Sequence, residues 1–116
     1  MVEYLNTDQI IEKYGSNHFY IAHFYDSPPK CDSPNTDKKP YRAYLKWASY
    51  ELNPIIAIVS ANGEQKTRNQ YFKYMVSDSL EELEKEYKFK KQLWINKRRA
   101  YLNSELQKLK EIENEL

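Results

Sequence analysis

The chain is poor in glycine and cysteine, and both shortages exclude whole classes of site. Its 116 residues include two glycines, Gly15 and Gly63, and one cysteine, Cys31. Two isolated glycines cannot form the glycine-rich loop that cradles the phosphates of a nucleotide. A lone cysteine forms no intramolecular disulfide, supplies no cysteine framework for a metal, and fits a reducing compartment. We therefore expect neither a nucleotide cofactor nor a disulfide scaffold.

Long apolar stretches and a strong net charge are also missing. No run approaches the roughly 18 apolar residues that a membrane span requires. The first residues, Met1 to Asn6, lack the basic and apolar regions of a secretory signal. These features predict a soluble, cytoplasmic protein with no membrane partner. The formal net charge is +1, which is not the charge of a simple polyanion binder.

Catalytic and metal-binding patterns are absent as well. His18 and His23 are five residues apart, a spacing that puts them on neither one helical face nor one strand face. No carboxylate or cysteine around them completes a zinc-ligand spacing. Paired acids such as Glu81 and Glu82 suit the first turn of a helix, where they interact favourably with its dipole. We predict a non-enzymatic protein with no cofactor and no bound metal.

The residues that are present predict an α+β fold. Asn6 can cap a helix that ends at Gly15, with Gln9 reaching back to the cap. Residues 26–39, rich in Ser, Pro, Asp and Asn, predict a surface loop. A second helix is predicted over about 38–52, because apolar residues recur there on one helical face.

The second half of the chain predicts a hairpin and a long helix. β-prone runs at 55–59 and 71–76 flank Asn62-Gly63, the dipeptide typical of a tight hairpin turn. Asp78 and Glu81 have the spacing of a capping box, and no glycine or proline follows. We predict an uninterrupted helix over most of 79–101. The division is therefore a small α+β body, 1–78, and a long charged C-terminal helix, 79–116, which either belongs to the same domain or forms a dimerisation tail.

Residues 18–25 leave two alternatives open, because their periodicity fits both a helix and a strand. As a helix, they would follow the helix that ends at Gly15 and form a helix-turn-helix, with the later hairpin as its wing. As a strand, they would join the hairpin in a small three-stranded antiparallel sheet, since Phe, Tyr and Ile are strand formers.

A resemblance to a known family lies in residues 4–15, YLNTDQIIEKYG. An apolar pair, a Thr-containing cap and a helix ending at Gly resemble the opening of the small winged-helix proteins typified by phage and transposon excisionases and by mercury-resistance-type regulators. In that family the second helix enters the major groove and the wing contacts the phosphate backbone. The resemblance implies that Asn17, His18 and His23 would contact bases, and that Lys66 and Arg68 would contact phosphates.

The C-terminal helix carries a basic block and an apolar seam. The block runs from Lys88 through Lys91 to Arg98 and Arg99 and is interleaved with aromatic residues. The block either binds phosphates and stacks on bases or forms a solvated helix face with aromatic residues buried beneath it. The seam repeats every seven residues, with one leucine between on the same side; its members are Ile95, Leu102, Leu106, Leu109 and Leu116. It predicts either homodimerisation or packing on the protein's own domain.

Two functional hypotheses follow. The first is a small DNA-binding accessory protein of a phage or other mobile element, with duplex DNA as its partner. The second is a protein-interaction module, for instance a phage-encoded inhibitor of a host or defence enzyme. The 11 tyrosines favour a contact surface, because tyrosine combines apolar area with a polar tip. The conformation of residues 18–25 separates the two hypotheses.

Overall fold

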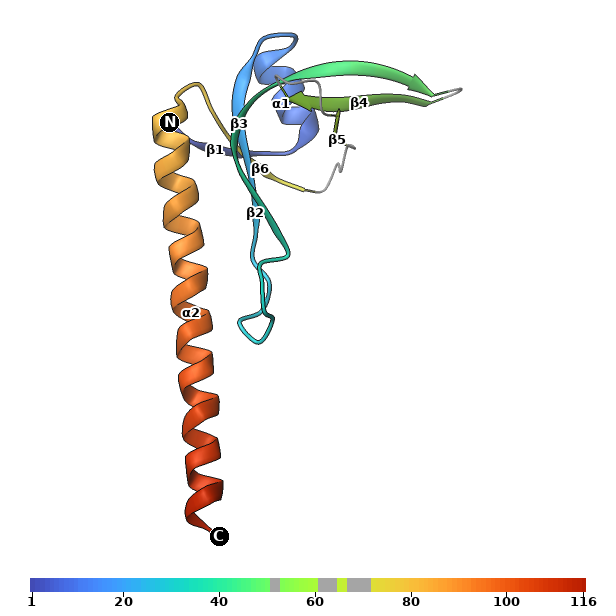
Figure 1. Ribbon diagram of the computed structural model, residues 1–116. Coiled ribbons are helices and arrows are strands. Elements are labelled where there is room, and N and C mark those ends of the chain that lie inside the picture. Colours follow the sequence, from blue (N-terminus) through green and yellow to red (C-terminus); the bar gives the residue numbers. More distant parts are fainter. Residues whose placement is uncertain (51–52, 61–64, 67–71) are drawn as a thin grey trace.

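The computed structural model describes the backbone of residues 1–50, 53–60, 65–66 and 72–116, and the side chains of 1–46 and 72–116. The described residues form the predicted α+β fold, with one six-stranded antiparallel sheet and two helices (Figure 1). In chain order the elements are β1 (Glu3–Leu5), α1 (Thr7–Tyr14), β2 (Phe19–Tyr25), β3 (Thr36–Tyr50), β4 (Asn53–Ser60), β5 (Gln65–Lys66), β6 (Tyr74–Ser77) and α2 (Leu80–Asn114).

Pairing between distant segments organises the sheet, whose strand order is β1-β6-β2-β3-β4-β5. β2 lies between β6 and β3, and the long strand β3 continues past β2 to pair with β4. β1 pairs with β6, so the start of the chain lies beside the strand that leads into α2. This arrangement fixes the first turns of α2 against the middle of the sheet.

Both faces of the sheet are covered around β2. Phe19 and Ile21 point to one face, where they pack with Ile10 and Tyr14 of α1. Ala22 points to the opposite face and belongs to the cluster that includes residues of α2. Because successive strand residues alternate between faces, a strand covered on both faces carries apolar residues at nearly every position.

Of the two alternatives for residues 18–25, the strand is correct and the helix is wrong. β2 begins at Phe19 and is paired on both sides. Burial on both faces removes the polar and apolar alternation that would have identified a strand in the sequence. The chain therefore has no second helix of a helix-turn-helix at this position.

The predicted helix over residues 38–52 is also wrong, because the described part of this segment, 38–50, belongs to β3. Tyr41, Ala43 and Leu45 alternate along β3 and join the core cluster under α1, so the same apolar residues satisfy a strand period. Pro40 lies where the pairing of β2 with β3 shifts register. Such a bulge tolerates a residue that lacks a backbone N–H.

Two further predictions need correction. The surface loop ends at Asn35 rather than residue 39, since β3 begins at Thr36. The described part of the run at 71–76 does not pair with the run at 55–59. β4, which contains the first run, pairs with β3 and, antiparallel across residues 61–64, with β5, so the partner strand of the hairpin is Gln65–Lys66; β6 pairs with β1 and β2. The predicted turn at Asn62-Gly63 lies outside the described residues.

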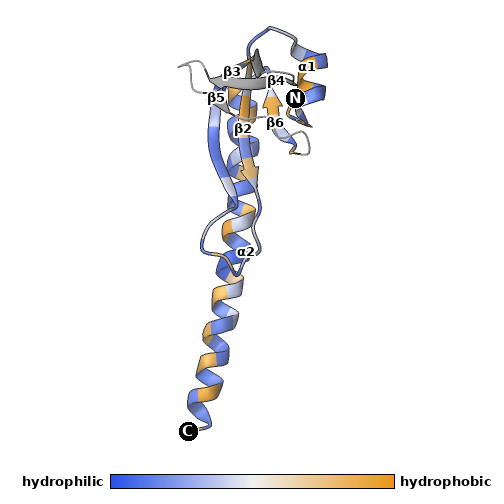
Figure 2. Cartoon of the chain, turned by 90° about the vertical axis from the view of Figure 1, so that its right-hand side faces the viewer, coloured by the Kyte–Doolittle hydropathy of each residue, from blue (hydrophilic) through white to orange (hydrophobic). Residues whose placement is uncertain are grey.

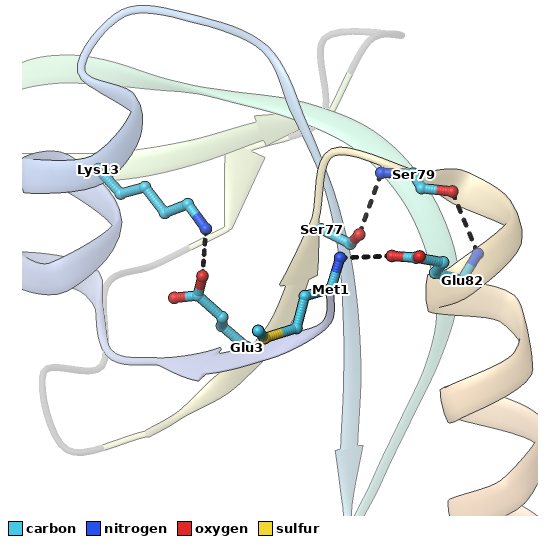
Figure 3. A network of polar contacts seen from close by, with 6 residues as sticks. All are labelled: Met1, Glu3, Lys13, Ser77, Ser79 and Glu82. Atoms are coloured by element: carbon cyan, nitrogen blue, oxygen red, sulfur yellow. Dashed lines mark hydrogen bonds and ion pairs between the residues drawn. The ribbon is translucent and has the colours of Figure 1, made fainter.

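Local capping signals explain α1. The Asn6 side chain accepts a hydrogen bond from the Gln9 N–H, and the Gln9 side chain accepts one from the Asn6 N–H, both at 2.9 Å. Gly15 ends the helix with φ at 59°, a conformation in which a residue without Cβ is favoured. Lys13 pairs with Glu3 at 2.5 Å and ties α1 to β1 (Figure 3). The predicted first helix is confirmed.

The N-cap of α2 lies one residue later than predicted, and the helix begins at Leu80. Ser79, not Asp78, is the cap, and its hydroxyl accepts a hydrogen bond from the Glu82 N–H at 3.3 Å. The Ser77 hydroxyl accepts the Ser79 N–H at 3.0 Å and shapes the turn out of β6 (Figure 3). The prediction of an uninterrupted helix is confirmed, and α2 is 35 residues long, about 52 Å at 1.5 Å per residue.

Candidate protein-interaction surface

The first half of α2 is attached to the body by apolar packing. Leu83 is fully buried, and Tyr87 and Trp94 are almost so, while Ala22 and Met75 meet Leu83 from the sheet. Tyr87 also meets the Phe24 ring edge-on at 6.1 Å. α2 therefore starts from a rigid base.

A polar cluster joins α2 to β3. Asp37 of β3 accepts a hydrogen bond from the Tyr87 hydroxyl and forms an ion pair with Lys91 at 2.8 Å. Burial alone would raise the pKa of the Asp37 carboxyl, but hydrogen bonds from Lys91 and Tyr87 outweigh burial and hold this pKa below its usual value. The same hydrogen bond from Lys91 to Asp37 raises the pKa of Lys91. The cluster therefore favours the charged forms of both partners.

We expect Asp37→Asn to lower the free energy of unfolding by about 1 kcal/mol near pH 7, since both partners of the ion pair are partly exposed to solvent. The depressed pKa of Asp37 means that its contribution is present above the pKa of the unfolded chain, near 4, and is lost as pH falls through the folded-state pKa. The free energies of unfolding of Asp37→Asn and of the unmodified chain, measured with urea, should therefore converge once the pH is below the folded-state pKa of Asp37.

Asp32→Asn is the matched control, because the Asp32 side chain is 99% exposed although it pairs with Arg98. Its unfolding curve should match that of the unmodified chain. A difference between Asp37→Asn and the unmodified chain that stayed constant down to low pH would contradict the assignment.

The loop between β2 and β3 contacts α2 further along. The indole N–H of Trp94 donates a hydrogen bond to the Ser27 carbonyl at 2.9 Å. Arg98 donates to the Pro29 carbonyl at 2.8 Å and to the Asp32 carboxylate at 3.0 Å. These contacts are the last polar contacts to the body that α2 makes among the described residues.

Beyond Arg98, α2 extends past the tip of this loop and past every other described element (Figure 1). Hydrophobic bands recur along this extension (Figure 2). Five large apolar side chains there are between 47% and 103% exposed. At 100° per residue, the four that lie in α2, Leu102, Leu106, Leu109 and Ile112, fall within an arc of about 120°, and Leu116 follows two residues after the helix ends at Asn114. We call them the apolar tail face: Leu102, Leu106, Leu109, Ile112 and Leu116.

The structure distributes the predicted basic block around the helix. Lys88 and Lys97 are both exposed and nine residues apart, about two and a half turns, so they lie on opposite sides. Lys91 and Arg98 are engaged by Asp37 and Asp32. The described basic side chains of α2 therefore do not all lie on one face.

The residues predicted to read DNA bases are also separated. Asn17 lies in the exposed turn after α1, where its N–H donates to the Tyr14 carbonyl at 3.0 Å. His18 is exposed before β2. His23 is only 7% exposed within the sheet, and its Nε2 lies 2.7 Å from the Tyr41 hydroxyl.

The structure describes little of the two residues that were predicted for the wing. Lys66 lies in β5, and its side chain is not described. Arg68 lies outside the described residues. Neither position is placed against another predicted DNA contact.

The described tyrosines do not gather on one contact surface, and four of them are half-buried: Tyr20, Tyr41, Tyr44 and Tyr101. Tyr14, Tyr74 and Tyr87 are buried, whereas Tyr4 and Tyr25 are exposed. The two exposed rings border one surface hollow of about 370 Å³.

Two site features were not identified from the sequence. The tethers formed by Asp37 and Asp32 carry no local signal, because each joins segments more than 50 residues apart. Ile112 was omitted from the predicted seam, although it lies three residues after Leu109 and four before Leu116, the spacing of one helical side.

Other kinds of site find no support in the described ranges. Side chains of His, Cys, Asp and Glu form no group of three there that could hold a metal ion. Within those same ranges, no helix combines the length and apolar character needed to cross a bilayer. Comparison of the chain with protein-family models, with curated proteins and with solved structures finds no match in any of the three.

Proposed function

We propose that this protein is a non-enzymatic protein-interaction module that docks a partner helix on the apolar tail face of α2. The observation that carries the proposal is the exposure of four large apolar side chains on one side of α2 beyond the body, with a fifth, Leu116, just after the helix ends. Single exposed hydrophobic residues are ordinary, but a contiguous apolar stripe typically marks an interaction site. Three-and-four spacing along a helix is the pattern by which helices pair.

The body supports this role by holding α2 in place. Leu83 and Trp94 are buried against the sheet and the loop, and Arg98 is bonded to the loop. A helix that is ordered before it binds loses less conformational entropy on association. The apolar tail face thus lies on a helix that the body holds in place before a partner binds.

DNA binding has less support. The residues expected to contact bases lie in a turn and in a buried strand position, and Lys91 and Arg98 already pair with acidic side chains. The net charge of +1 gives little general attraction to phosphate.

We therefore expect no saturable binding when labelled duplex DNA is titrated with the protein at low salt, where attraction to phosphates is strongest. Fluorescence anisotropy measures this directly. Saturable binding that weakens steeply with added salt, and that is reduced by Lys88→Ala with Lys97→Ala, would favour the DNA-binding hypothesis instead.

The proposed function is tested by photocrosslinking in the cells that make the protein. A photoreactive benzoylphenylalanine replaces Leu109, and a control chain carries it at Gln107. These positions differ by about 200° around the helix, so only the first belongs to the apolar tail face. We expect a discrete protein adduct from position 109 and at most a trace from position 107. Equal labelling at both positions, or no protein adduct from position 109, would overturn the proposal.

A further inference from the structure

The side of α2 that packs on the body continues into the apolar tail face. Tyr87, Lys91, Trp94 and Arg98 contact the body, and they recur at intervals of three and four residues. The same intervals continue through residues 102, 105, 109, 112 and 116. Residues at this spacing share one helical side. A partner helix docked on the apolar tail face therefore lies in line with the loop between β2 and β3. Its end meets the tip of that loop.

This geometry decides how two copies can pair. In a parallel pair, both bodies would lie at the same end and on the side where the helices face each other. The loop residues at Trp94 and Arg98 already occupy that side. In an antiparallel pair, the bodies lie at opposite ends and each tail remains accessible to the other.

Charge along α2 is complementary in the antiparallel arrangement. Lys97 and Arg99 are exposed, and in the described part of the chain they have no ion pair, whereas Glu111, Glu113 and Glu115 are exposed near the end of the helix. Arg99 and Glu113 each lie seven residues from Leu106. An antiparallel pair centred there sets Arg99 of each copy level with the partner's Glu113. A parallel pair would instead set like charges side by side.

We propose that the partner helix is α2 of a second copy, paired antiparallel through the apolar tail face about a twofold axis near Leu106. This inference rests on the proposed function and names its partner. A twofold pair repeats each contact, so the Arg99 to Glu113 contact is made twice. The dimer presents two bodies at the two ends of one helical rod.

Mass and orientation test the pairing. Light scattering should give twice the single-chain mass of 14.0 kDa, at concentrations of about 1 to 100 µM, where pairing of moderate affinity is detected. Spin labels then report orientation in a Cys31→Ser background. Ser104 and Asn114 both lie on the side of α2 away from the partner, so labels at either position are about 20 Å apart across the pair. At Ser104→Cys, two residues from the centre, this distance is nearly the same in either orientation. At Asn114→Cys, eight residues from the centre, antiparallel helices add a separation of about 24 Å along the axis, whereas parallel helices add none.

Substitutions test the contacts. Leu106→Glu places two carboxylates at the axis and should weaken dimerisation at least a hundredfold, whereas Gln107→Glu, on the far side, should leave it unchanged. Arg99→Glu should weaken dimerisation about tenfold, and adding Glu113→Arg should restore it. Failure of this rescue, or the same label distance at Ser104→Cys and Asn114→Cys, would overturn the antiparallel arrangement.

Failure of this inference can be told apart from failure of the proposed function. A single-chain mass throughout the concentration range overturns self-pairing. If the photocrosslink from position 109 then joins a different protein, the proposed function stands and only the partner is wrong. If position 109 yields no protein adduct at all, both proposals fail. An adduct of twice the chain mass supports both.

Discussion

Leu83→Ala is expected to lower the free energy of unfolding by about 3 kcal/mol, because it removes a fully buried side chain and leaves a cavity. Leu83 is the residue through which the first turns of α2 meet Ala22 and Met75 of the sheet. Loss of this contact weakens the attachment of α2 as well as the core. Urea unfolding followed by circular dichroism measures the effect.

Leu93→Ala is the matched control, since Leu93 lies in the same helix and is 39% exposed. The same chemical change there should lower the free energy of unfolding by less than about 1 kcal/mol. Similar losses for the two variants would mean that α2 is not attached through the side that contains Leu83.

Trp94→Ala is expected to cost about 3 to 4 kcal/mol and to release the loop between β2 and β3. The indole is only 7% exposed, and its N–H holds the Ser27 carbonyl. Without it, the polar contacts that join the loop to α2 in the described part of the chain are the two made by Arg98. Hydrogen exchange should therefore increase most at loop residues 27–33, in addition to the lower free energy of unfolding.

Phe89→Ala provides the comparison for Trp94→Ala, because Phe89 is an aromatic residue of the same helix that is 58% exposed. It should leave exchange in the loop unchanged and lower stability only slightly. If Trp94→Ala destabilised the chain while exchange at 27–33 stayed as before, the tryptophan would not be what holds the loop.

Short-range signals in the sequence predicted the helices that are present. The Asn6 and Gln9 cap, the positive φ at Gly15 and the uninterrupted helix after residue 79 all depend on residues within a few positions of one another. For these two helices, the one wrong detail was the cap of the second. Asp78 and Ser79 are adjacent, and both residue types are good caps. The backbone selected Ser79, whose N–H is held by Ser77.

Most of the apolar seam was likewise predicted from the sequence, because helical spacing is a local property. Leu102, Leu106, Leu109 and Leu116 were predicted from their repeat, and the structure adds Ile112 to the same side. What the repeat left open was whether the seam packs on the body or remains exposed. The answer depends on where the body ends along α2.

The sequence by itself determined the fold class, the capped first helix and the long final helix, since each of these depends on local residue pattern. Only the tertiary structure decided that residues 19–25 and 36–50 are strands, because their neighbours in the sheet come from distant parts of the chain. Because both faces of β2 are covered, its sequence lacks the alternation of polar and apolar residues that identifies a strand. The extent of the body along α2 likewise decided which leucines are exposed. Packing on the sheet and loop covers one side of α2 as far as Arg98. Beyond that residue the same side of the helix is exposed.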